Sequence, residues 1–184
     1  MSLLTIYSDN SLSNASVFTS FDDIEHQLKA IGVQFERWTA TAEFSADADQ
    51  ESVLAAYADA IDRLKSQYDF QSVDVISLSP SHPDKVAFRQ KFLAEHIHDD
   101  FEIRFFVEGR GLFYLHVANK VYAVLCEQGD LISVPANTTH WFDMGENPSF
   151  KTIRLFTTAD GWVAKFTGSA IAATFPSLDD LFPE

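Results

Sequence analysis

The sequence has little cysteine and little basic charge. Cys126 is its single cysteine, so an internal disulfide is impossible and nothing in the chain requires an oxidising compartment. Lys and Arg number 13 against 27 Asp and Glu, which gives a formal net charge of −14 at pH 7. A surface of this charge repels phosphate groups. We therefore expect neither nucleic acid nor an anionic membrane as a partner.

Long hydrophobic runs are also absent. No apolar stretch approaches the roughly 18 residues that a membrane-spanning helix needs. Residues 1–10 carry no basic residue ahead of their short apolar run, unlike a secretory signal peptide. With 7 Gly and 6 Pro in 184 residues, a collagen-like or low-complexity chain is excluded as well. These absences lead us to expect a cytoplasmic globular protein.

What the sequence does contain is enough apolar material for a hydrophobic core. Hydrophobic residues make up 46% of the chain, and 17 residues are Phe. A folded chain of this length buries roughly 70% of the surface that it exposes when unfolded. We expect a single domain over residues 1–184. Because a high net charge on a small domain disfavours association, we also expect a monomer.

The first 92 residues are predicted to mix helices with short strands. Ser20 and Asp23 have the spacing of a helix N-cap box, and apolar residues recur after them at three- and four-residue steps. The expected helices cover 21–30, 50–68 and 83–93, and the expected strands cover 3–7, 33–38 and 73–78. In the third helix we expect Val86, Ala87 and Phe92 to face inward.

From residue 96 onward the hydrophobic period changes to two, which indicates strands. Six short strands are expected, at 103–107, 112–117, 121–126, 131–134, 140–144 and 152–156. Turn signals rich in Gly, Asn and Asp separate them, including one at 108–111. This spacing indicates an antiparallel sandwich or barrel, so the fold class is mainly β (α+β). We expect residues 93–158 to form the barrel, 1–92 to pack on it, and 159–184 to be a C-terminal strap. Its acidic end, residues 177–184, is expected to be a surface strap or frayed.

The segment 95–102 contains the residues best suited to chemistry. Residues two apart on an extended strand point to the same side, so the side chains of His96 and His98 converge. Together with the Glu102 carboxylate they form a set of nitrogen and oxygen donors that suits Fe, Ni, Mn, Co, Cu or Zn. His140 opens a strand directly after a turn and is the candidate for a fourth ligand.

Other histidines and the cysteine have a simpler interpretation. A lone histidine on a strand or helix is more often a satisfied structural residue than a ligand, and we apply this to His26, His82 and His116. Cys126 lies in an apolar strand with no acid or base partner in view, so we expect it to be inert core.

Two longer motifs raise the case for a metal site. They are His96-x-His98-x3-Glu102-x6-Gly109 and Gly129-x5-Pro135-x-Asn137-x2-His140. The first matches the first cupin motif at each position, and the second resembles the second cupin motif. Asn137 stands where Gly is usual, which is a mild departure because Asn tolerates a left-handed turn; the Asn expected after His140 is missing. The resemblance implies a cupin double-stranded β-helix, a jelly-roll barrel with a few flanking N-terminal helices.

Further stretches resemble one cupin family, the acireductone dioxygenases. They are residues 33–38, 68–77, 97–100, 102–109, 130–135 and 140–144, so the similarity covers nearly the whole chain. The resemblance implies that His96, His98, Glu102 and His140 bind one Fe²⁺ or Ni²⁺ per chain. The implied substrates are O₂ and 1,2-dihydroxy-3-keto-5-methylthiopentene, the acireductone of methionine salvage. An iron form would give 4-methylthio-2-oxobutanoate and formate, and a nickel form 3-methylthiopropanoate, formate and CO.

A doubly deprotonated substrate needs positive charge beyond the metal, because three neutral imidazoles and one carboxylate leave a divalent ion with one formal positive charge. Arg104 lies two residues after Glu102, and strand parity directs it inward. The resemblance also links Arg104 to formation of the substrate dianion. The alternative is a structural ion pair between Arg104 and Glu95 or Asp100. Arg154 is a second candidate for substrate binding, with a structural ion pair as its alternative too.

Supporting roles are expected for residues around the ligands. Glu95 and Asp100 could hold imidazole N–H groups, and the resemblance links Glu95 to metal loading and Phe101 to a relay of conformational change. Three phenylalanines are candidates for the wall around the methylthio end of the substrate: Phe92, Phe106 and Phe142. Core packing is the alternative for each of them.

Two rival functions stay open from the sequence. One is another metal-dependent cupin enzyme, such as a different dioxygenase or a sugar isomerase, which the substrate would distinguish. The other is a non-catalytic cupin that senses or stores a small ligand, which would bind that ligand tightly without metal. The donor set suits iron and nickel alike, because selection between them depends on availability in the cell.

Overall fold

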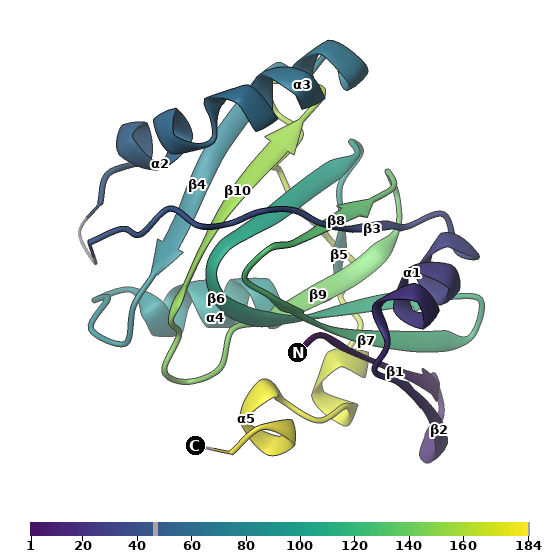
Figure 1. The fold of residues 1–184 in the computed structure, drawn as a ribbon. Coiled ribbons are helices and arrows are strands. Elements are labelled where there is room, and N and C mark those ends of the chain that lie inside the picture. The colour runs from purple at the N-terminus through teal and green to yellow at the C-terminus, as the bar shows by residue number, and fades with distance from the viewer. Residues whose placement is uncertain (46–47, 184) are drawn as a thin grey trace.

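Antiparallel strands form the framework of the molecule (Figure 1). The computed structural model describes residues 1–45 and 48–183. Its strands are β1 (Leu3–Ser8), β2 (Ser11–Phe18), β3 (Gln34–Arg37), β4 (Ser72–Leu78), β5 (His96–Ile97), β6 (Glu102–Val117), β7 (Lys120–Glu127), β8 (Asp130–Val134), β9 (Thr139–Asp143), β10 (Phe150–Phe156) and β11 (Lys165–Phe166). Its helices are α1 (Phe21–Lys29), α2 (Gln50–Ala56), α3 (Ala58–Tyr68), α4 (Lys85–Leu93) and α5 (Leu178–Leu181), with a 3₁₀ turn at Ile171–Thr174.

The strands form two layers that share β6. One layer has the order β11-β5-β9-β6-β7-β1-β2, and the other consists of β4, β10, β6, β8 and β3. The first half of β6 pairs with β8 and β10, whereas its second half pairs with β7 and β9. Helices α2 and α3 cover the outer face of β4 and β10 (Figure 1). The prediction of a mainly β fold with flanking N-terminal helices is confirmed.

Strand β6 is longer than expected, because the predicted turn at 108–111 is wrong. The two strands predicted at 103–107 and 112–117 are one continuous strand with a β-bulge: Lys151 pairs with Glu108 but Thr152 pairs with Phe106. Gly109 makes this possible with a left-handed φ of 70°, and a Cβ there would lie 1.8 Å from the carbonyl oxygen of Ser149.

The bulge changes which side chains of β6 face the barrel interior. Before it, Ile103 and Phe105 pack outward beneath α2 and α3 while Arg104 and Phe106 face inward. After it, Phe113 and Leu115 face the interior core. One extra residue on a strand reverses its alternation. Both halves of β6 can therefore contribute inward side chains to one site.

The helices also differ from the prediction. The helix expected over 50–68 is interrupted at Tyr57, whose φ of −118° and ψ of 19° separate α2 from α3. The Tyr57 ring is buried against Phe105, with 5.3 Å between ring centroids, so tertiary packing stabilises the break. The Ser20 cap is confirmed: its Oγ accepts a hydrogen bond from the backbone N–H of Asp23.

In α4 the inward face is the predicted one only in part. The helix begins at Lys85, after Pro83, and Val86 and Ala87 are exposed. Phe92 packs on the core as expected, together with Phe88 one turn earlier. Their aromatic rings hold α4 at the rim of the barrel.

The C-terminal segment packs against the barrel. Tyr114 donates its hydroxyl to the backbone carbonyl of Pro176, and Leu178 is buried and donates its backbone N–H to Asp143 at 2.7 Å. Ser177 and Asp180 form a capping box at α5. Glu184, which ends the predicted strap, lies outside the described residues.

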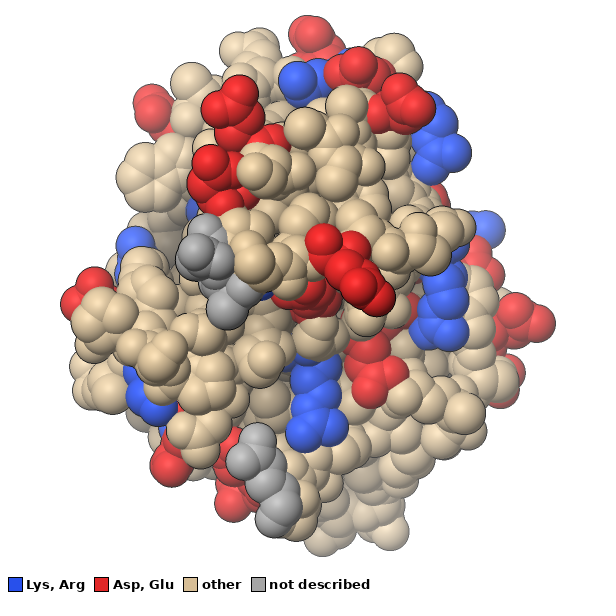
Figure 2. All heavy atoms as spheres, turned by 60° about the vertical axis from the view of Figure 1, so that its left-hand side comes forward, with Lys and Arg blue, Asp and Glu red and all other residues tan. Residues whose placement is uncertain are grey.

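The surface carries charged side chains of both signs, and the helices are short. Figure 2 shows acidic and basic side chains scattered over one face among residues of other types. In the described part of the chain, no helix is long and apolar enough to cross a membrane.

Candidate metal centre and its cavity

Three histidines converge at the open end of the barrel. His96 in β5 and His140 in β9 are direct register partners, and their ring centroids lie 4.4 Å apart. His98 follows β5, with its ring centroid 5.1 Å from that of His96 and 5.3 Å from that of His140. Ligand nitrogens of the three rings lie within 4.8 Å of one another, and all three side chains are buried. The spacing is that of residues able to share one metal ion.

Backbone carbonyls fix the tautomer of each ring. The Nδ1 atoms of His96, His98 and His140 lie 2.7, 3.0 and 2.7 Å from the carbonyl oxygens of Ala94, Val163 and Thr138, respectively. A carbonyl oxygen only accepts a hydrogen bond, so each Nδ1 bears the proton and each Nε2 keeps its lone pair. Burial lowers the pKa of His96 and lowers that of His140 to about 3, which keeps both rings neutral. Neutral imidazoles with oriented Nε2 atoms are the form that binds metals.

Glu102 places a carboxylate oxygen beside the histidines. Its side chain is 1% exposed; Oε1 accepts hydrogen bonds from Nε and Nη2 of Arg104 at 3.2 and 2.8 Å. Oε2 lies 3.6 Å from Nε2 of His98 and 3.7 Å from Nε2 of His140, and accepts no hydrogen bond from any described residue. Burial raises the pKa of Glu102, but the neighbouring groups, Arg104 first among them and then His98, His140 and Arg154, together outweigh burial and hold the pKa well below its usual range. A buried anionic oxygen facing two imidazole lone pairs needs a cation, so these residues fit a metal.

The turn before His140 has the conformation that the sequence predicts. Asn137 has a φ of 62°, in the left-handed region, and its backbone N–H donates to the carbonyl oxygen of His98 at 2.8 Å. This hydrogen bond ties the segment before β9 to the segment after β5, so Asn137 performs the backbone role for which Gly is usual.

Arg104 lies beside the metal centre on β6. Its guanidinium carbon is 4.8 Å from the ring centroids of both Phe113 and Phe142. Its Nη1 atom is buried and donates to none of the residues that the structure describes. Arg104 forms an ion pair, as one alternative from the sequence predicted, but its partner is Glu102 rather than Glu95 or Asp100. Arg104 therefore keeps one donor after its ion pair is formed.

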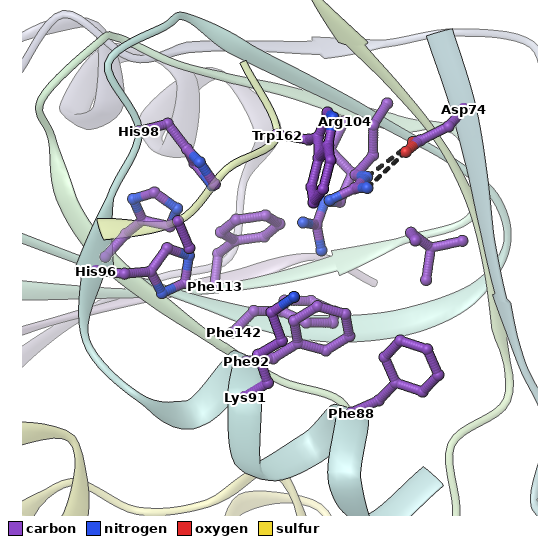
Figure 3. Close-up of a pocket in the computed structure, with 14 residues that line it drawn as sticks. Asp74, Phe88, Lys91, Phe92, His96, His98, Arg104, Phe113, Phe142 and Trp162 are labelled. Carbon is purple, nitrogen blue, oxygen red and sulfur yellow. Dashed lines mark hydrogen bonds and ion pairs between the residues drawn. The ribbon is translucent and has the colours of Figure 1, made fainter. Parts of the chain in front are cut away.

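A cavity of about 320 Å³ joins these groups (Figure 3). Figure 3 shows His96 and His98 at one side of it and Arg104 at another. His140 and Arg154 also line the cavity. The remaining lining residues are Asp74, Ile76, Phe88, Lys91, Phe92, Phe113, Phe142, Trp162 and Ala164. The cavity is thus polar near the candidate metal ligands and mainly apolar beneath α4.

Several expected site residues lie elsewhere. Phe92 and Phe142 line the cavity, but Phe106 is fully buried behind Phe142, with 6.3 Å between their ring centroids, so its assignment to the wall is wrong. Phe101 stacks on Phe70 at 6.1 Å, outside the cavity. Arg154 lines the cavity while forming two hydrogen bonds to Asp74, at 2.9 and 2.6 Å.

Neither carboxylate expected around the imidazoles reaches them. Glu95 contacts Nδ1 of His116 at 3.0 Å and accepts a hydrogen bond from Thr167 Oγ1 at 2.7 Å. Asp100 accepts hydrogen bonds from the backbone N–H of Phe101 and from Thr157 and Thr158. The expectation that they hold the N–H groups of the metal ligands is wrong, because backbone carbonyls occupy those positions.

The structure also adds residues that sequence reasoning missed. Trp162, from the loop between β10 and β11, lines the cavity without any local signal in the sequence. Asp74 has a signal in retrospect, since it is a single charge inside the otherwise apolar strand expected at 73–78.

Comparison with known proteins identifies similar chains over nearly the whole length of this one. The family model described as the ARD/ARD' family matches residues 4–164. Proteins named acireductone dioxygenase from Methylococcus capsulatus and Pseudomonas aeruginosa are 59% identical over 180 residues and 54% identical over 181 residues. Each alignment covers 98% of this chain, with 97% and 100% of the respective relatives.

A solved structure shows the same fold. An acireductone dioxygenase from Bacillus anthracis with a cadmium ion in its active centre superimposes with a TM-score of 0.80 at 29% identity, covering 90% of this chain and 98% of that one. This likeness confirms the predicted cupin fold and, with the three-histidine site, supports a metal cofactor. The extent of these matches places the chain in the acireductone dioxygenase family.

Proposed function

We propose that this protein is a metal-dependent dioxygenase that cleaves the acireductone 1,2-dihydroxy-3-keto-5-methylthiopentene with O₂. The observation that carries the proposal is Oε2 of Glu102, a buried anionic oxygen that faces Nε2 of His98 and His140 beside the unpaired donor of Arg104. The names of the relatives support the substrate class.

His96, His98, Glu102 and His140 would hold one Fe²⁺ or Ni²⁺. The bound ion would supply a Lewis-acidic centre with positions left open for oxygen ligands. The iron form is proposed to give 4-methylthio-2-oxobutanoate and formate, and the nickel form 3-methylthiopropanoate, formate and CO. The proposed pathway is methionine salvage. A monomeric state and a cytoplasmic location stay predictions from the sequence.

Arg104 is proposed to bind the substrate oxyanion. Its Nη1 atom is the guanidinium donor that Glu102 leaves unoccupied, and the rings of Phe113 and Phe142 hold the group in place. A buried donor positioned before the substrate arrives stabilises negative charge without reorganisation. Arg154 adds positive charge to the same cavity, and Phe92 and Phe142 are proposed to contact the methylthio end.

Oxygen uptake and headspace CO test the proposal directly. Anaerobically prepared acireductone is given to metal-free, iron-loaded and nickel-loaded protein. We expect uptake with both metals, CO with nickel alone, and neither with metal-free protein. Absence of uptake from forms that each contain one metal per chain would reject acireductone as the substrate and leave the metal site in place.

A further inference from the structure

One row of charged side chains crosses three strands on the wall of the cavity. Arg154 in β10 is the register partner of Arg104 in β6 on one side and of Asp74 in β4 on the other. All three residues line the cavity (Figure 3). Two buried arginines are therefore cross-strand neighbours, an arrangement that is unfavourable unless anions compensate it.

The two arginines are compensated differently. Glu102 occupies Nε and Nη2 of Arg104 and leaves Nη1 unpaired. Nε and Nη2 of Arg154 donate hydrogen bonds to the carboxylate of Asp74, which lies on the side of the cavity away from the metal centre. Burial lowers the pKa of Arg154, but the hydrogen bond to Asp74 and the charges of Glu102 and Asp74 together outweigh burial and raise it. Asp74 thus holds Arg154 charged while drawing its donors away from the cavity centre.

A count of formal charges shows what Asp74 adds. With neutral histidines, Glu102 and Asp74 balance Arg104 and Arg154, so the wall is neutral before a metal binds. A divalent ion then gives the site a charge equal and opposite to that of a doubly deprotonated acireductone. Lys91 also borders the cavity, but its side chain is exposed and solvent screens its charge. Without Asp74 the site would carry one excess positive charge.

Excess positive charge would matter after the reaction. If the proposed function is right, on which this inference rests, both organic products of the iron form are carboxylates. An excess positive charge in the cavity would raise its affinity for these carboxylates and slow their release, whereas a cavity whose charges balance releases them faster.

We propose that Asp74, by pairing its negative charge with Arg154, sets the net charge of the cavity and so limits the affinity for carboxylate products. Substitution D74N removes the charge and keeps a hydrogen-bond acceptor for Arg154. The carboxylate product should then bind more tightly and leave more slowly.

The first test measures binding rather than turnover. Nickel-loaded full-length protein is titrated with 4-methylthio-2-oxobutanoate and, separately, with its uncharged methyl ester. We expect D74N to bind the acid roughly tenfold more tightly than the wild type, as one unit charge about 10 Å away would do at an effective dielectric constant of about 20. The ester should bind both proteins equally.

A matched control is available in another ion pair of β10. Glu108 pairs with Lys151 of β10 at 2.7 Å, and neither residue lines the cavity. E108Q removes an equivalent carboxylate from an ion pair of β10, and its affinity for the acid should equal that of the wild type. In steady-state turnover by the iron form, D74N should lower kcat and KM together, while E108Q should change neither.

Two further variants separate charge from direct contact and do not depend on D74N folding. R154Q leaves Asp74 unpaired and should weaken binding of the acid roughly tenfold by the same charge argument. D74N/R154Q replaces the ion pair with an amide pair and should restore wild-type affinity. If the double variant binds as weakly as R154Q, Arg154 contacts the anion directly and the proposal is overturned.

Equal or weaker binding of the acid by D74N, or equal tightening for the ester, would also overturn it. These binding results are independent of the proposed reaction. A wild type that binds the acid but consumes no acireductone would reject the proposed function, and the comparison among variants would still decide the role of Asp74.

Discussion

His96 and His140 face each other across β5 and β9, and each ring is held in the same way, by the carbonyl oxygen of the residue two positions earlier. The two hydrogen bonds are both 2.7 Å long. One strand pair therefore places two candidate ligands and fixes both tautomers before a metal arrives. Such preorganisation removes much of the ordering that binding would otherwise require.

The candidate ligands make a direct prediction about metal content. His96→Ala and His98→Ala each remove one donor from a site whose ligand nitrogens lie within 4.8 Å of one another. We expect the metal affinity to fall by more than roughly 100-fold, beyond the loss typical of outer partners of a ligand. Elemental analysis after dialysis measures the effect. His26→Ala, on the exposed face of α1, is the matched control and should keep its metal; retention of one ion per chain by His96→Ala would reject the assignment.

Arg104 should matter for turnover and not for metal content. Arg104→Gln removes the charged donor nearest the proposed oxyanion, and we expect kcat/KM to fall roughly 10²- to 10³-fold, as for loss of an oxyanion-binding donor. Metal content by elemental analysis should stay at the wild-type level. Arg110→Gln is the control, since Arg110 lies on the same strand with its guanidinium over Phe182, outside the cavity. An unchanged kcat/KM for Arg104→Gln would mean that Arg104 is only a structural partner of Glu102.

Stability of the metal-free protein should depend on pH through His140. Its folded-state pKa of about 3 lies below the ordinary value of 6.5, chiefly because the ring is buried. Between these two values the unfolded chain binds the proton and the folded chain does not, so stability falls as the pH falls. The slope from this residue is up to about 1.4 kcal/mol per pH unit.

Urea unfolding between pH 7 and pH 5 with a chelator present tests that slope. His140→Gln removes one of the two histidines whose pKa burial lowers and should reduce the slope, whereas His26→Gln, which alters an exposed side chain, should leave it as in the wild type. Identical slopes for the wild type and His140→Gln would show that His140 is not held neutral by burial.

Asn137 gives a test of backbone conformation. Because its φ is 62°, Asn137→Ala places a side chain in the left-handed region and should cost about 1 kcal/mol of unfolding free energy. Asn137→Gly should stay within about 0.5 kcal/mol of the wild type, since Gly adopts this φ freely. Urea denaturation of the two variants measures the difference. Equal stabilities would mean that the turn relaxes to another conformation and does not need the left-handed residue.

The sequence by itself determined the fold class and the candidate ligands, because both depend on local patterns. The alternation of apolar residues after residue 96 indicated strands. The spacing of His96, His98 and Glu102 placed side chains on one side of the chain, and the motif around Asn137 indicated a left-handed turn.

Tertiary structure alone decided which groups surround those ligands. The bulge at Val107 merges two expected strands because the neighbouring strand β10 continues to pair across it. Asp74 meets Arg154 only through the register of β4 with β10, and Phe106 is displaced from the cavity by Phe142. Contacts of this kind join residues far apart in the chain, and a local pattern contains no information about the register that brings them together.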